Sequence, residues 1–117
     1  MENLEIWLVH EKYYVMVSNQ GRCLSCHPNP KVQVGVVTSG TPQGTRDGII
    51  MMMGPTSRLT NKRVHKPVHH LVVDCFFPGS VNRRKSLVIR HLDGNKTNNN
   101  VDNLKIITRA FARMNKN

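Results

Sequence analysis

The sequence is poor in aromatic residues and in long apolar runs, and each shortage excludes a class of protein. One tryptophan, two tyrosines and three phenylalanines make up 5% of the 117 residues, so stability must depend on short-range packing and hydrogen bonds rather than on a wide core. The length fits one small domain, or two modules that share a modest core. No apolar run approaches the roughly 18–20 residues that cross a bilayer, and the acidic start of the chain lacks a targeting signal. We therefore expect a cytoplasmic protein with no membrane partner.

Cysteine is also scarce. The three cysteines, Cys23, Cys26 and Cys75, are an odd number in a chain without a secretory signal, which argues against a disulfide framework. Cys23 and Cys26, with Cys75 or a histidine, could be considered as zinc ligands. On a strand, however, Cys23 and Cys26 would face opposite sides. We expect reduced, half-buried thiols and no zinc.

Acidic residues are few, and the excess of basic residues is confined to one half of the chain. Residues 1–57 carry four basic and four acidic residues, whereas residues 58–117 carry 13 basic and three acidic ones, and 13 minus three is the whole net charge of +10. Such segregation is typical of a protein that binds a polyanion. We favour nucleic acid over a basic face that only aids solubility, and we divide the chain at this boundary into two modules.

The first module is predicted to be rich in β-structure. Residues 6–25 predict two short strands around the turn Asn19-Gln20-Gly21. Residues 28–57 are rich in Pro, Gly, Thr and Ser, and suggest weaker strands at Val32–Val37 and Ile49–Met53. The role of this middle region is left open.

The second module begins with a predicted helix. Pro67 is suited to a first helical turn, and the helix should end before Pro78. One helical face would carry the apolar residues Val68, Leu71, Val72, Cys75 and Phe76. A strand at 87–89, a polar loop, a strand at 104–107 and a final helix capped by Thr108 complete the chain. The fold class is therefore α+β.

Three segments together resemble the HNH nucleases of phage and intron-encoded type. The most specific is VIRHLDGNKTNNNVDNL at 88–104, which is similar to the core of that family. The helix segment VHHLV at 68–72 resembles the part that precedes this core. Residues 5–7 and 14–22 are similar to a short N-terminal module often fused to it. The resemblance implies a small N-terminal β-hairpin or sheet module, a helix, and a C-terminal ββα-metal motif that binds one divalent ion.

The resemblance also implies roles for individual residues. Hydrolysis of a phosphodiester needs a base with a near-neutral pKa and a divalent cation that neutralises charge on the phosphate. His91 would be that base, and Mg²⁺ or another divalent metal the cofactor. Asn103 would brace the loop that holds the His91 strand. We interpret the other loop asparagines, at 95, 98, 99 and 100, as turn formers, and His69 as packing behind the site.

The metal ligands are where the sequence departs from the family. The residue before the first histidine, an acid in well-studied relatives, is Arg90, and the position for an Asn in the final helix is Ala112. Asn115 is a weak replacement, because three residues advance a helix by about 4.5 Å. The ligand set is therefore unknown.

Two functions follow from these residues. The first is a DNA endonuclease in which basic residues contact phosphates; the candidates are Arg83, Arg84, Lys85, Arg90, Lys96, Arg109 and Arg113. The second is a catalytically inactive HNH module that binds DNA, RNA or a host nucleic-acid machine, which Arg90 and Ala112 favour. The target sequence, the choice between a nick and a double-strand break, the oligomeric state and the biological partner stay open.

Overall fold

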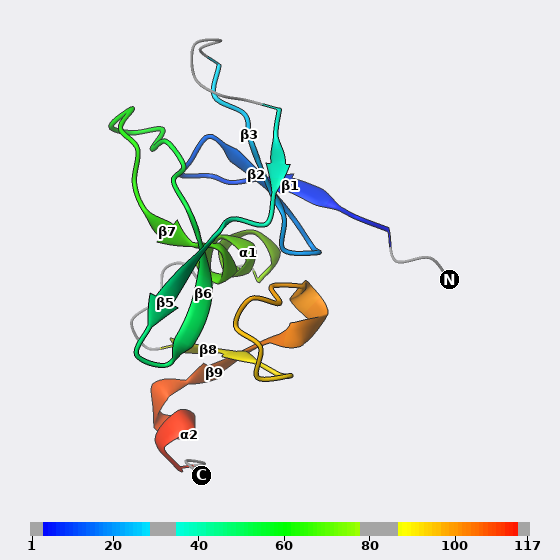
Figure 1. The fold of residues 1–117 in the computed structure, drawn as a ribbon, viewed down its shortest axis with the longest axis vertical. Coiled ribbons are helices and arrows are strands. Elements are labelled where there is room, and N and C mark those ends of the chain that lie inside the picture. The colour runs from blue at the N-terminus through cyan, green and yellow to red at the C-terminus, as the bar shows by residue number, and fades with distance from the viewer. Residues whose placement is uncertain (1–3, 29–34, 78–86, 115–117) are drawn as a thin grey trace.

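Three small antiparallel sheets surround one central helix (Figure 1). The computed structural model describes residues 4–28, 35–77 and 87–114. Within these ranges, no helix has both the length and the apolar character needed to cross a membrane. The mixed, sheet-rich architecture agrees with the predicted α+β class.

The first sheet comes from the N-terminal module and contains the predicted hairpin. Its strands, in spatial order, are β1 (Trp7–Val9), β2 (Val15–Ser18), β3 (Cys23–Ser25) and β4 (Val37–Thr38). The turn between β2 and β3 places Gly21 at a φ of 79°, a conformation that only glycine adopts readily. The hairpin around this turn is therefore confirmed, and β1 extends it by pairing with β2.

The second sheet consists of a long hairpin and a short third strand. β5 (Thr41–Thr45) pairs with β6 (Gly48–Met53), and β6 pairs with β7 (Lys66–Pro67). The expected strand at 49–53 is confirmed as part of β6. Of the expected strand at 32–37, only Val37 lies in a strand, and residues 32–34 lie outside the described ranges.

The central helix, α1 (Val68–Phe76), begins and ends where the sequence predicts. Pro67 is its N-cap, with a φ of −64°. The predicted apolar face is buried at Val68, Leu71 and Val72, while Cys75 is only partly buried. Val73 is buried as well, although the predicted stripe omits it, because α1 is covered on more than one side.

The C-terminal part has the predicted order of strand, loop, strand and helix. β8 (Leu87–His91) pairs with β9 (Leu104–Thr108), a 3₁₀ turn η2 (Val101–Asn103) precedes β9, and α2 (Arg109–Met114) follows it. The Thr108 hydroxyl accepts a hydrogen bond from the Phe111 backbone N–H at 3.1 Å, as an N-cap does.

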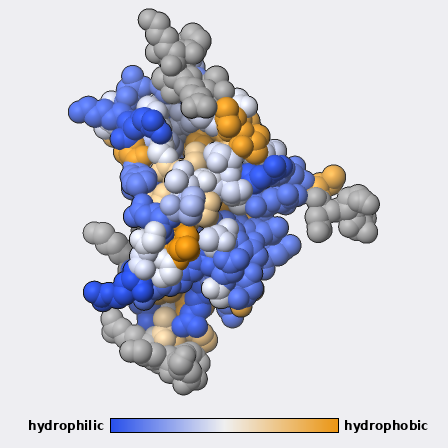
Figure 2. Space-filling model, in the orientation of Figure 1, coloured by the Kyte–Doolittle hydropathy of each residue, from blue (hydrophilic) through white to orange (hydrophobic). Residues whose placement is uncertain are grey.

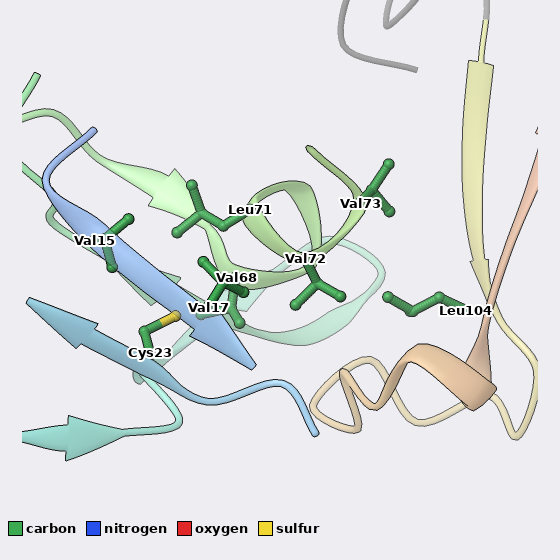
Figure 3. Packing of buried hydrophobic residues seen from close by; sticks show 8 residues of the cluster. All are labelled: Val15, Val17, Cys23, Val68, Leu71, Val72, Val73 and Leu104. Carbon is green, nitrogen blue, oxygen red and sulfur yellow. The ribbon is translucent and has the colours of Figure 1, made fainter. Parts of the chain in front are cut away.

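One hydrophobic core joins these parts. Val15, Val17 and Cys23 of the first sheet pack with the buried face of α1, and Leu104 of β9 completes the cluster. Figure 3 shows the Leu104 side chain extending toward Val72 of α1. Residues on both sides of the predicted module boundary thus share a single core.

Two of the three cysteines belong to this packed region, and all three are free thiols. Burial raises the pKa of the Cys23 thiol to about 12 and that of Cys75 to about 11. Both therefore stay protonated at neutral pH and pack as small apolar groups.

Candidate functional site

His91 is held at the C-terminal end of β8 by the strand beside it. It lies opposite Leu104 in the β8–β9 register, and Leu104 is 5% exposed in the core. The backbone of His91 is therefore fixed to the core through its partner strand, while its side chain is only half-buried. A histidine in this position can present its ring to a molecule in solution.

A buried asparagine selects the tautomer of the neutral His91 ring. The Nε2 atom of His91 lies 2.8 Å from Oδ1 of Asn99, and Asn99 is 4% exposed. A carboxamide oxygen only accepts hydrogen bonds, so Nε2 carries the proton and Nδ1 keeps a lone pair in the neutral ring. Nδ1 is thus the atom of His91 that can accept a proton.

Asn103 braces the loop between β8 and β9. Its Nδ2 donates to Asp93 Oδ1 and to the Asn98 carbonyl, both at 2.9 Å, and its Oδ1 accepts from the Asp93 backbone N–H at 3.0 Å. Asn103 is buried, so these bonds replace water that the amide would otherwise bind. Asn103 therefore closes the loop across its base.

Two further histidines lie beside this strand. The rings of His69 and His91 are 5.2 Å apart between centroids, at an angle of 77°. His69 also contacts His70, with centroids 4.7 Å apart. Both histidines, with Leu87, Val88, Ile89 and Arg109, line a cavity of about 250 Å³ against β8. His69 of α1 thus packs against the ring of His91, in the position that the resemblance implies.

Comparison with known proteins places this arrangement in a fold. No protein-family model and no curated protein matches the chain. Among solved structures, the chain is similar to a structure of the HNH homing endonuclease I-HmuI that describes DNA binding and cleavage by that enzyme. The TM-score is 0.58 and the sequence identity is 24%. The chain has an HNH-type fold. The similarity covers 95% of this chain but 57% of that one, so the chain spans little more than half the length of that endonuclease.

In the part of the chain that the structure describes, the side chains do not fit a metal ion held by the protein alone. Among the described residues, no group of three or more His, Cys, Asp or Glu side chains could hold a metal. Arg90 is exposed next to His91, and its positive charge opposes a cation. Ala112 in α2 has no ligand atom, and Asn115 lies outside the described residues.

The basic candidates fall into three groups. Arg90 and Arg109 are exposed at the two ends of the β8–β9 sheet. Lys96 is half-buried, and its Nζ donates to the Asp47 carbonyl at 3.0 Å, which joins the β5–β6 turn to the loop after β8. The third group lies outside the described part of the chain: Arg83, Arg84 and Lys85 entirely, and Arg113 in its side chain. The face in Figure 2 is mostly hydrophilic around the C-terminal half.

The loop of the HNH-type fold should weaken in acid. Hydrogen bonds from Asn98, from the Asn95 backbone and from Asn103 lower the pKa of Asp93 below its ordinary value of 3.8. The ionised form is favoured in the folded loop, so its contribution is present above pH 3.8 and is lost as the pH falls through the lowered pKa. We expect the side-chain amide signals of Asn98 and Asn103 in NMR spectra to lose their dispersion over that acidic window.

Asp93→Asn separates this effect from general acid unfolding. The variant cannot ionise, so its loop signals should show no transition in that window. If the wild type and the variant change together, Asp93 is not the group responsible.

Proposed function

We propose that this protein is an HNH-type DNA endonuclease that hydrolyses phosphodiester bonds with His91 as general base and with Mg²⁺ or another divalent metal as cofactor. The observation that carries the proposal is the bond between His91 and Asn99, because it keeps a lone pair on Nδ1 of a half-buried histidine anchored to the core. The similarity to an endonuclease that binds and cleaves DNA supports DNA as the substrate.

The chain's own residues supply base catalysis and charge. His91 Nδ1 would remove a proton from the attacking water, a contribution typically worth about 10²–10⁴-fold in rate. Arg90 and Arg109, both exposed, would bind phosphate oxygens through their planar guanidinium groups. The described side chains do not provide a ligand set for the divalent ion, so the phosphate and water would have to supply most of its oxygen ligands.

Plasmid nicking at low salt tests the proposal. Wild-type protein should nick DNA with Mg²⁺ or Mn²⁺ and lose that activity with a chelator. His91→Ala should reduce the rate by about 10²–10⁴-fold and leave DNA binding nearly unchanged. His65→Ala is the matched control, because His65 is an exposed histidine outside the β8–β9 region. Equal rates for wild type and His91→Ala would contradict the assignment.

A second function is favoured by Arg90 and Ala112, which stand where the family's metal ligands would be. On this alternative, the protein is an inactive HNH-fold module that binds DNA, RNA or a nucleic-acid machine. Wild-type protein would then bind without cleaving, and Arg90→Asp combined with Ala112→Asn would gain nicking activity. Competition between duplex DNA and RNA for the bound protein would identify the preferred nucleic acid.

A further inference from the structure

We propose that the turn at residues 18–22 of the N-terminal sheet is a positioning element for His91 and acts through Asn99. This inference rests on the proposed role of His91 as general base. The turn is far from His91 in sequence, and it makes two direct contacts with the loop that carries Asn99.

The first contact is a close approach of two backbones. Gly21 is buried, and a Cβ added to it would lie 2.7 Å from the carbonyl carbon and oxygen of Asn99 and 2.8 Å from the Asn99 Cβ. Carbon atoms in contact normally stay about 3.5–4.0 Å apart. A side chain at position 21 would therefore push the Asn99 backbone away, so glycine is needed here for space as well as for its φ of 79°.

The second contact fixes the loop on the other side of Asn99. The Val101 backbone N–H donates to the Asn19 carbonyl at 2.8 Å. Asn19 is held in turn by its side chain, whose Oδ1 accepts from the Ile6 N–H at 2.8 Å and whose Nδ2 donates to the Leu4 carbonyl at 3.1 Å. The loop thus rests on a part of the turn that is fixed to residues 4–6, the segment before β1.

The turn is rigid enough to act as a support. Ser18 is fully buried, and its hydroxyl accepts from the Gln20 and Arg22 backbone N–H groups at 3.2 and 3.1 Å. The Arg22 guanidinium pairs with the carboxylate of Glu5. These bonds fix the conformation in which Gly21 and Asn19 meet the loop.

Asn99 connects the turn to His91, the proposed general base. Its Oδ1 holds His91 Nε2, whereas its Nδ2 is buried with no hydrogen-bond partner among the described residues. The orientation of the carboxamide therefore depends on packing against Gly21 and on the bond to His91. Moving the Asn99 backbone should release His91 from the tautomer with its proton on Nε2.

Nitrogen-15 NMR of the histidine rings tests the proposal without requiring cleavage. Gly21→Ala should shift the His91 ring signals from an Nε2–H pattern toward a mixture of tautomers. The matched control is Gly35→Ala, because Gly35 has a φ of 78° with no atom within 4 Å of an added Cβ. It carries the same backbone strain without the collision, so its His91 signals should match the wild type.

Further variants keep the test decisive if Gly21→Ala does not fold. Val101→Pro removes the N–H that bonds to Asn19 and should shift the same signals. Asn99→Leu should shift the His91 signals toward the mixture of tautomers of an unbonded ring, and Asn99→Asp, which keeps an acceptor oxygen, should retain the Nε2–H pattern. Unchanged His91 signals in folded Gly21→Ala or Val101→Pro would overturn the role of the turn.

Nicking kinetics then separate this inference from the proposed function. If the wild type cleaves DNA, Gly21→Ala should lower kcat by up to about 10²-fold with little change in KM, as expected for a displaced catalytic group. If the wild type does not cleave but the ring signals shift as described, the positioning contact stands and the endonuclease assignment fails.

Discussion

On the proposed function, affinity for DNA is expected to fall by about 10³–10⁴-fold between 50 and 200 mM salt. The reason is counterion release: each phosphate neutralised contributes about 0.9 to the log–log slope for duplex DNA. Seven basic candidates in residues 58–117 predict a slope of about −6, and this half of the chain carries the whole net charge of +10. Fluorescence anisotropy with a labelled duplex over a salt series measures the slope.

Single substitutions assign the contacts. Arg90→Ala and Arg109→Ala should each reduce the slope by about one unit. Lys12→Ala is the matched control, because Lys12 is exposed in the half of the chain that has no net charge. The Nζ of Lys96 already donates to the Asp47 carbonyl. A reduced slope for Lys96→Ala would therefore show that this lysine contacts phosphate as well. A slope near zero for the wild type would exclude phosphate neutralisation as the basis of binding.

Asp74→Ala is expected to lower the free energy of unfolding by about 3 kcal/mol, a large share of the roughly 5–15 kcal/mol of a small domain. Asp74 Oδ2 lies 2.8 Å from His10 Nε2, and the two side chains are 11% and 2% exposed. His10 Nδ1 accepts from the Lys12 N–H at 2.9 Å, so the ring proton is on Nε2 and donates to Asp74. Removing the carboxylate takes away a charged acceptor from this buried N–H.

Urea unfolding followed by circular dichroism measures this change. Asp102→Ala is the control, because Asp102 is exposed and surface substitutions usually stay within about 0.5 kcal/mol. Equal unfolding midpoints for both variants would show that the contact between His10 and α1 contributes little.

The elements that could be predicted from sequence are those with a strong local signal. Pro67 and the apolar spacing of the next residues determine where α1 begins and which face is buried. Thr108 likewise marks the start of α2, because its residue type is typical of an N-cap. The pairing of β5 with β6 could not be predicted, because β5 is exposed throughout and contains Pro42 and Gly44, which are poor strand formers.

The candidate site also contains residues that could be predicted from the sequence and one that could not. His91 and Asn103 could be singled out because residues 88–104 resemble the HNH core. Asn99 could not be separated from its neighbours Asn98 and Asn100, since all three are equally suited to a turn. Only the folded chain shows that Asn99 is the one that meets His91 and Gly21.

The core joins residues that are far apart in the sequence, and this separation has a consequence for protein synthesis. Leu104 packs with residues that leave the ribosome much earlier, such as Val15 and Val17, and the Asn19–Val101 bond closes a loop of similar length. Contacts this distant form late, because the chain must first lose the entropy of closing the loop. A nascent chain shorter than β9 has neither the partner strand of His91 nor its loop support. On the proposed function, unfinished polypeptides would therefore be harmless to the DNA of the cell that translates them.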